Sequence, residues 1–271
     1  MFVTSPTPFT DLNAVLSEWL TGVRAVLGAD LTAAYLQGSF AVGDFDEDSD
    51  VDFLAAIRAE LTDAQLAGLQ SLHARVYDLP SPWAQHLEGS YFPEAALRRF
   101  DPAGVQPWYL DNTSKVLVRS SHDDTLVTRW VTREYGITLT GPDPKTLIDP
   151  VTADDLRREV LGTMRDWGAE ILDGRYRLDN QWAQPFAVLM YCRMLHTLRT
   201  GTVRSKLAGA QWAKETLESQ WTGLIERAWN ERPDPSLKVR QPAAPDDTRA
   251  TLDFIRHALE AGQQYAKPLQ G

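Results

Sequence analysis

The chain has 271 residues, of which 43% are hydrophobic and 24% are charged, a composition typical of one large globular domain or two smaller ones. Its 27 Lys and Arg residues stand against 37 Asp and Glu residues, which gives a formal net charge of −10 at pH 7. A surface this acidic cannot neutralise a phosphate backbone over a broad area, so nucleic acid is not an expected partner. A cationic small molecule is favoured instead.

The sequence also bears on the cellular compartment. The first residues, MFVTSPTPFTDLN, lack the basic and apolar regions of a secretory leader, and no apolar run is long enough to span a bilayer. We therefore expect a cytoplasmic protein without a membrane partner. The single cysteine, Cys192, excludes an internal disulfide, and its place in the apolar run FAVLMYCRML predicts a buried structural thiol.

In the first half of the chain, segments with the hydrophobic periodicity of helices alternate with segments typical of strands. Apolar residues recur at helical spacing over 11–28, and Asp11 suits the start of that helix. The short apolar runs at 31–37 and 51–57 predict two strands joined by a polar stretch. Further predicted elements are a helix from Thr62 to about Tyr77, a strand at 84–92, a strand at KVLVRS and a helix at 123–135.

The second half is helical almost throughout. The segment 136–155 is dense in Gly, Pro and Asp, which predicts a connection with turns, and we place a domain boundary inside it. The pattern therefore predicts an α/β half followed by a helical bundle. The predicted helices are 152–173, 184–200, 205–215, 217–230 and 248–266, with a Pro-rich interruption at 233–245.

The stretch LQGSFAVGDFDEDSDVDFLAAI contains the pattern richest in chemistry. Asp50 and Asp52 are two residues apart at the start of a predicted strand, so both carboxylates leave the same face. Such a pair can hold Mg²⁺, which prefers hard oxygen ligands and keeps contacts to substrate phosphates. Gly38 would let a phosphate approach the backbone, and the Ser39 hydroxyl could bind it.

This acidic stretch has two other interpretations. An acidic loop before a strand is often a solvated turn, and two alternating aspartates occur frequently by chance. A calcium-binding EF-hand loop counted from Asp44 fails at two positions. Its sixth residue is Ser49, where the turn needs Gly, and its twelfth is Ala55, where a bidentate Glu is needed.

Glu88, in HLEGSYF, supplies a third carboxylate from the next predicted strand. A neighbouring strand could bring it beside the aspartate pair, where it would complete the metal shell or act as a base on a substrate hydroxyl. The alternative is a glutamate on an edge strand that faces water, which the spacing alone leaves equally open.

Two further groups of residues contain side chains that could serve a site. His122, Asp123 and Asp124 contain metal-ligand types, but adjacent residues do not converge on one ion, so a helix-capping role for one aspartate is favoured. Trp108 and Tyr109 could line an acceptor-binding cleft, although core packing is the default for such aromatic residues.

Gly38-Ser39, ten further residues, and then Asp50-Val51-Asp52 before an apolar strand resemble the nucleotidyltransferase motif of the DNA polymerase β superfamily. Within it the chain is most similar to the AadA type of adenylyltransferases that modify streptomycin and spectinomycin. ITLTGPDPKTLIDPVTADDL resembles their interdomain segment, and AVLMYCRMLHTLRTGTVRSKLAGAQWA resembles their helical domain. The likeness covers nearly the whole chain.

The resemblance implies a fold and a set of roles. Residues 1–150 would form an α/β (α+β) nucleotidyltransferase domain with a mixed sheet, and 151–271 an all-α helical bundle, with ATP and acceptor bound between them. Asp50 and Asp52 would hold Mg²⁺, with Glu88 as catalytic base, metal ligand or both. Gly38 and Ser39 would contact the triphosphate, and Lys206 falls where the family has a lysine that reaches the phosphates.

The implied reaction is attack of an acceptor hydroxyl on the α-phosphorus of ATP, with release of pyrophosphate. The acidic residues that the family uses near the acceptor are replaced here by Gln and Pro, in NQWAQPF, so Asp179 and Trp182 are the candidate acceptor contacts, with Trp108. We expect a monomer. The alternatives are the same transfer to a metabolite or protein hydroxyl, and a nucleotide-binding module that has lost turnover.

Overall fold

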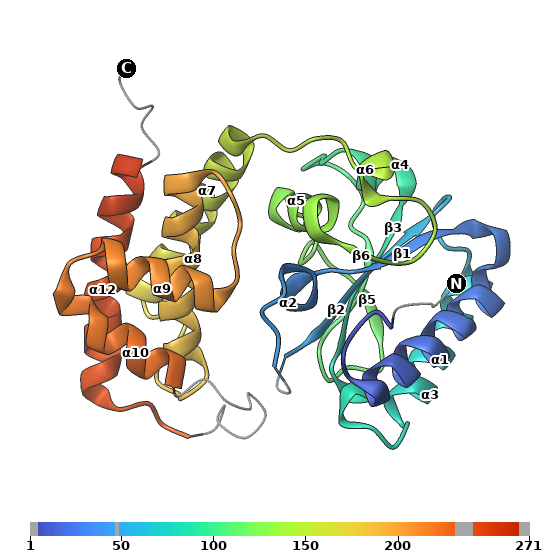
Figure 1. Cartoon of the computed structure of the whole chain (residues 1–271), viewed down its shortest axis with the longest axis horizontal. Coiled ribbons are helices and arrows are strands. Elements are labelled where there is room, and N and C mark those ends of the chain that lie inside the picture. The colour runs from blue at the N-terminus through green and yellow to red at the C-terminus, as the bar shows by residue number, and fades with distance from the viewer. Residues whose placement is uncertain (1–4, 47–48, 231–240, 266–271) are drawn as a thin grey trace. The chain divides into compact units, whose positions relative to one another are not determined.

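The computed structural model describes residues 5–46, 49–230 and 241–265. The chain divides into two units, Met1–Pro150 and Val151–Gly271 (Figure 1). The first contains a six-stranded sheet with helices on both faces, and the second is built of helices. The predicted fold class, an α/β domain with a mixed sheet followed by a helical domain, is confirmed.

The sheet of the first unit has the strand order β5-β4-β3-β2-β1-β6. β2 and β3 are parallel, whereas the other neighbouring strands are antiparallel. The parallel register pairs Asp52 with Glu88, so both strands begin at the same edge of the sheet. The strands are β1 (Leu31–Leu36), β2 (Val51–Ile57), β3 (Leu87–Pro93), β4 (Trp108–Leu110), β5 (Leu117–Arg119) and β6 (Ile137–Thr140).

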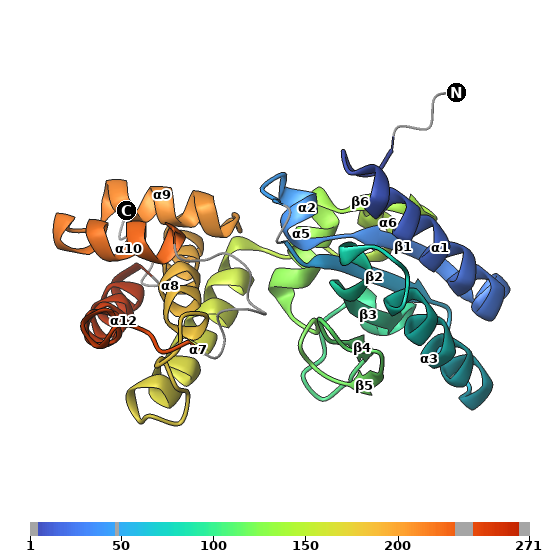
Figure 2. The same ribbon diagram turned by 90° about the horizontal axis from the view of Figure 1, so that it is seen from below.

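Helices cover the two faces of this sheet differently. α1 and α3 pack against one face and form the larger core with Phe53 and Tyr91 (Figure 2). On the other face, α4 and α6 cover Leu54 and Phe92 (Figure 1). Because successive strand residues alternate between faces, Asp52 and Glu88 share the second face. The helices are α1 (Thr10–Leu27), α2 (Gly38–Val42), α3 (Asp63–Tyr77), α4 (Glu94–Arg98), α5 (Leu126–Tyr135) and α6 (Pro144–Leu147).

The second unit is organised around α8, which is buried along most of its length. α8 contacts α7, α9, α10 and α12, so the apolar run that contains Cys192 forms the centre of the bundle. Cys192 is fully buried, as predicted, and burial raises the pKa of its thiol. The helices are α7 (Ala153–Leu172), α8 (Ala183–Thr200), α9 (Lys206–Thr216), α10 (Thr222–Asn230) and α12 (Pro245–Tyr265).

Several element boundaries differ from the predicted ones for local reasons. The strand expected over 84–92 begins at Leu87, because Pro82–Gln85 form a short 3₁₀ helix. The helix expected over 217–230 begins at Thr222, after a 3₁₀ turn at Ser219–Trp221, and the last helix begins at Pro245 rather than 248. Most of the expected Pro-rich interruption, 233–240, and residue 266 of the last helix lie outside the described residues.

Two strands were missed altogether. β4 has three residues and shows no alternation long enough to detect, whereas β6 lies inside the segment expected to be a connection. The prediction that an aspartate caps the helix near 123 was also wrong. Thr125 caps α5 by accepting a hydrogen bond from the backbone N–H of Thr128, at 2.9 Å.

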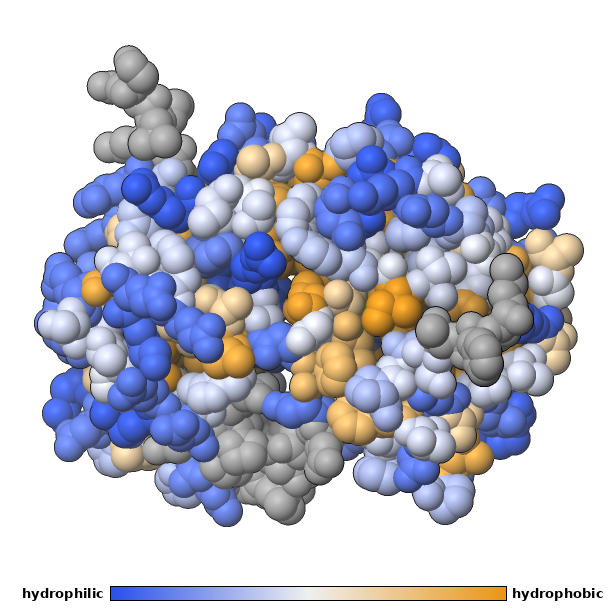
Figure 3. Space-filling model, in the orientation of Figure 1, coloured by the Kyte–Doolittle hydropathy of each residue, from blue (hydrophilic) through white to orange (hydrophobic). Residues whose placement is uncertain are grey.

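In the parts of the chain that are described, no helix combines the length and the apolar character that a bilayer span requires. The face shown in Figure 3 is largely hydrophilic, with smaller hydrophobic patches between the polar side chains. Large apolar side chains that are exposed are few, and they include Val105, Val116 and Val118 in the first unit. Scattered residues of this kind are ordinary on a protein surface.

A buried hydrogen-bonded group lies between the sheet and its helices. His73 of α3 is 2% exposed, and its Nε2 lies 2.9 Å from the hydroxyl of Tyr91, which also accepts a hydrogen bond from the Trp19 indole at 3.3 Å. Burial lowers the pKa of His73 to about 3. His73 is therefore neutral in the folded protein throughout the physiological range.

This burial predicts an acid-sensitive contribution to stability. Below its ordinary pKa of about 6.5, His73 takes up a proton only in the unfolded chain, so the free energy of unfolding falls as the pH decreases. At pH 5 the loss is about 2 kcal/mol, from roughly 1.4 kcal/mol per pKa unit. Urea denaturation at pH 7 and pH 5 measures this loss. Between the two pH values, the free energy of unfolding should fall by about 2 kcal/mol less in His73→Gln than in the wild type. Equal losses in the two proteins would contradict this assignment.

Candidate active site

The candidate site lies at the edge of the sheet where β1 ends and β2 and β3 begin. Gln37 follows β1, and its backbone N–H donates to the carbonyl oxygen of Asp52 at 2.9 Å. α2 begins at the next residue, Gly38. This connection holds the Gly38-Ser39 segment against the first residues of β2.

At Gly38 the backbone lies very close to the Asp52 carboxylate. The φ of Gly38 is +60°, and a Cβ atom at this position would lie 1.8 Å from Oδ2 of Asp52. Only glycine therefore accommodates the observed carboxylate position. The neighbouring Ser39 Oγ is buried and has no hydrogen-bond partner among the described residues. A buried hydroxyl left unpaired calls for an explanation, and an absent ligand supplies one.

The two aspartates offer hard oxygen donors. Asp50 precedes β2 and Asp52 lies within it, and the side-chain amide of Asn112 donates to Oδ1 of Asp50 at 2.5 Å. Among the described residues no three His, Cys, Asp or Glu side chains are arranged to enclose a metal ion. Two carboxylates are the kind of hard oxygen donor that Mg²⁺ commonly takes together with substrate phosphates.

Glu88 lies beside Asp52 on the neighbouring strand. β3 is an interior strand between β2 and β4, and the Glu88 side chain is 13% exposed, so the alternative of an edge-strand glutamate facing water was wrong. Its Oε1 accepts a hydrogen bond from the Tyr109 hydroxyl at 2.5 Å and lies 3.3 Å from Nε2 of His122. The carboxylate is thus held by two side chains that the motif does not contain.

The surroundings of Glu88 change the ionisation of its neighbours. The hydrogen bond to Glu88 raises the pKa of His122 to about 9, against the opposing effect of burial, and the Asp123 and Asp111 carboxylates contribute in the same direction. Burial raises the pKa of Asp123 to about 6, although its carboxylate accepts a 2.8 Å hydrogen bond from Ser90. Burial and the Glu88 charge raise the pKa of the Tyr109 hydroxyl, which therefore remains a donor.

Sequence reasoning missed most of these partners. The sequence predicted a helix-capping role for an aspartate of the group His122, Asp123 and Asp124, yet His122 contacts Glu88, and Asp123 is buried against Ser90. The structure does not bring Trp108 to Glu88: its partly buried ring packs against the core on the α1 and α3 face, with the Arg119 guanidinium 4.4 Å from its centroid. Strand alternation turns its neighbour Tyr109 toward Glu88 instead.

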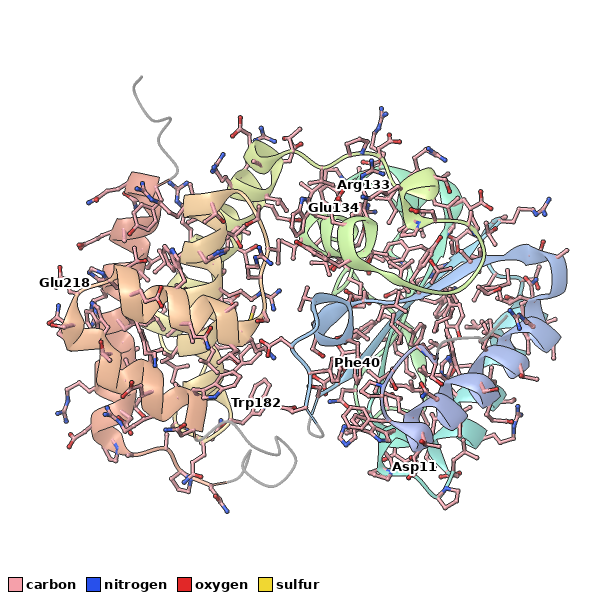
Figure 4. All side chains as sticks on the ribbon, viewed as in Figure 1. Asp11, Phe40, Arg133, Glu134, Trp182 and Glu218 are labelled. Atoms are coloured by element: carbon pink, nitrogen blue, oxygen red, sulfur yellow. The ribbon has the colours of Figure 1, made fainter. Side chains whose placement is uncertain are left out.

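In the second unit, two candidate residues meet on one aromatic ring. Trp182 lies at the start of α8 (Figure 4). Its ring stacks on Phe186 with a centroid distance of 4.8 Å. Lys206 begins α9, which Ser205 caps, and its Nζ lies 5.3 Å from the centroid of the same Phe186 ring. Asp179 is instead ion-paired with Arg177.

Comparisons with known proteins agree with this architecture. Residues 146–256 match the family model described as aminoglycoside adenylyltransferase, C-terminal domain. The chain is 23% identical to an aminoglycoside (3'') (9) adenylyltransferase from Shigella flexneri over 235 residues, which cover 80% of this chain and 84% of the relative. It is 24% identical to a spectinomycin 9-adenylyltransferase from Staphylococcus aureus over 227 residues, covering 76% and 79% of the two chains.

A solved structure shares the fold. The spectinomycin adenyltransferase AAD(9) from Enterococcus faecialis, crystallised with ATP and spectinomycin, superposes with a TM-score of 0.70 at 16% identity, over 91% of this chain and 98% of its own. The protein therefore has the two-part fold of an adenylyltransferase, a sheet-containing unit followed by a helical unit. The chain is AadA-like, which confirms the resemblance predicted from its motifs.

The contact between Gly38 and Asp52 predicts a specific effect of adding one methyl group. Gly38→Ala places its Cβ on the Asp52 carboxylate, so we expect at least a tenfold weaker affinity for Mg·ATP, measured by calorimetry. Gly43→Ala is the matched control, because Gly43 has a φ of +74° and open space around its Cβ position. Both variants carry a backbone cost of roughly 1–2 kcal/mol. Equal affinities in the two variants would contradict a role for Asp52 in binding Mg·ATP.

Proposed function

We propose that this protein transfers AMP from ATP to a hydroxyl group of an aminoglycoside or aminocyclitol antibiotic, with Mg²⁺ as cofactor and pyrophosphate as the second product. The parallel pairing of Asp52 with Glu88, beside Gly38, is the observation that carries this proposal. It gathers a metal-binding pair and a third carboxylate at one edge of the sheet. The named activities of the relatives support the transfer and the class of acceptor.

In this proposal Asp50 and Asp52 hold Mg²⁺, which when bound would neutralise charge on the reacting phosphates. Gly38 lets the triphosphate approach the backbone, and the unpaired Ser39 hydroxyl donates to a phosphate oxygen. Gly38 already lies against the Asp52 carboxylate, so the backbone that would meet the triphosphate adjoins a metal-binding side chain.

We propose Glu88 as the general base rather than a metal ligand. Its Oε1 is engaged by Tyr109 and His122, whereas Oε2 has no hydrogen bond to any described residue. Oε2 would accept the proton of the acceptor hydroxyl as that oxygen forms its bond to the α-phosphorus. The bond from the α-phosphorus to the bridging oxygen breaks, and pyrophosphate leaves with that electron pair.

For the second unit we propose that Lys206 contacts the nucleotide phosphates and Trp182 packs on a ring of the acceptor. Over 179–185 the chain offers Asp179 alone as a carboxylate, and its ion pair with Arg177 occupies it. The Gln184 amide is also occupied, because it is buried and donates to Thr251 Oγ1 at 2.7 Å. We therefore propose spectinomycin as the acceptor ahead of streptomycin, whose two guanidinium groups favour carboxylate contacts.

The experiment is release of pyrophosphate from ATP and Mg²⁺ across a panel of spectinomycin, streptomycin, other aminoglycosides and a blank without acceptor. We expect release with spectinomycin above the blank, and loss of at least a thousandfold in kcat for Asp50→Asn with an unchanged melting temperature. Added salt should raise KM for the cationic acceptor, because it screens the attraction of an acidic protein. If no member of the panel gives pyrophosphate release above the blank while Mg·ATP still binds, an antibiotic is not the acceptor. Full activity of Asp50→Asn would overturn the assignment of Asp50 as a metal ligand.

A further inference from the structure

A tight turn follows β4 and lies against the start of β2. The backbone N–H of Ser114 donates to the carbonyl oxygen of Asp111 at 3.0 Å, which closes the turn. Thr113 has a φ of +61°, and among the described residues no other residue besides glycine has a positive φ. Its N–H donates to the carbonyl oxygen of Gln85 at 3.0 Å, just before β3. A strained conformation of this kind persists only where the surrounding structure fixes it.

Side chains from β4 and this turn contact both functional strands. The Tyr109 hydroxyl donates to Oε1 of Glu88 at 2.5 Å, and the Asn112 amide donates to Oδ1 of Asp50 at 2.5 Å. Each donor thus reaches one oxygen of a different candidate catalytic carboxylate. The other side-chain atom of Asn112, Oδ1, is buried without a hydrogen-bond partner among the described residues. Burying this amide oxygen without a partner costs free energy, and the closure of the turn by its backbone does not need that side chain.

The position of Asp111 adds a constraint on Tyr109. The Tyr109 hydroxyl has one hydrogen, yet two carboxylates lie within reach of it: Glu88 at 2.5 Å and Asp111 at 3.1 Å. The shorter contact identifies Glu88 as the main acceptor of that hydrogen. Tyr109 is further fixed by stacking on His122, with a centroid distance of 4.9 Å. The hydroxyl is consequently directed at one oxygen of Glu88.

We propose that β4 and its turn, residues 108–114, form a positioning element for the carboxylates, in which Tyr109 orients Glu88 and Asn112 orients Asp50. This inference rests on the proposed function. Each donor restrains one oxygen of its carboxylate and so fixes the orientation in which that carboxylate meets substrate or metal. Partners of this kind commonly change metal affinity or activity by 10- to 100-fold. Tyr109 and Asn112 are positioning residues, because they act through the two carboxylates.

The test for Asn112 does not depend on turnover. Binding of Mn²⁺ with a non-hydrolysable ATP analogue, followed by the electron paramagnetic resonance signal of free Mn²⁺, should be about tenfold weaker or more for Asn112→Ala. Asn230→Ala, at the end of α10 in the other unit, is the matched control and should bind as the wild type does. Asn112→Ser serves as a second variant if the alanine variant melts early. Wild-type affinity in a folded Asn112 variant would overturn the assignment.

The test for Tyr109 separates binding from the chemical step. Tyr109→Phe keeps the ring but removes the hydroxyl, so kcat should fall about tenfold or more while KM for ATP and the affinity for the Mn²⁺ complex stay within twofold. Tyr135→Phe, on an exposed tyrosine at the end of α5, is the control and should keep both kinetic constants. Unchanged kcat for Tyr109→Phe would overturn its role. If the wild type releases no pyrophosphate with any acceptor, the proposed function fails, and the Asn112 measurement alone then decides the positioning element.

Discussion

The parallel register between β2 and β3 is the constraint on which the candidate site depends. It pairs Asp52 with Glu88 and starts both strands at one sheet edge, where the antiparallel β1 also ends and delivers Gly38. A shift of one residue in either strand would send its carboxylate to the opposite face, into the core formed with α1 and α3. The apolar residues that alternate along both strands therefore determine the face on which Asp52 and Glu88 lie, as well as the composition of the core.

The residues of the motif could be predicted because their signal is local. Gly38, Asp50 and Asp52 lie in one short stretch, and alternation alone indicates a shared face for the aspartates. The partners of these residues could not be predicted in the same way. β4 is three residues long, and Tyr109 reaches Glu88 only through strand pairing across 21 residues of sequence. Pairing between strands distant in sequence leaves no periodic pattern in either segment.

In the helical half, the secondary structure could be predicted from the sequence more readily than the binding residues could. Its helices were predicted well, because amphipathic patterns and capping signals such as Thr152, which accepts from the N–H of Asp155, are also local. The candidate binding residues of that half were harder to judge. The stacking of Trp182 on Phe186, under Lys206, joins helices α8 and α9 and became visible only in the structure. Gln184, by contrast, is an internal hydrogen-bond partner rather than a ligand contact.

The account separates two kinds of carboxylate: a metal-binding pair, Asp50 and Asp52, and a base, Glu88, whose Oε1 is held by Tyr109 and His122. The affinity of Glu88→Gln for Mg·ATP, measured by calorimetry beside Asp52→Asn, tests this division most directly. The account predicts that Glu88→Gln binds Mg·ATP within about twofold of the wild type yet releases no pyrophosphate, whereas Asp52→Asn loses binding. Loss of Mg·ATP binding in a folded Glu88→Gln protein would contradict it and make Glu88 a metal ligand.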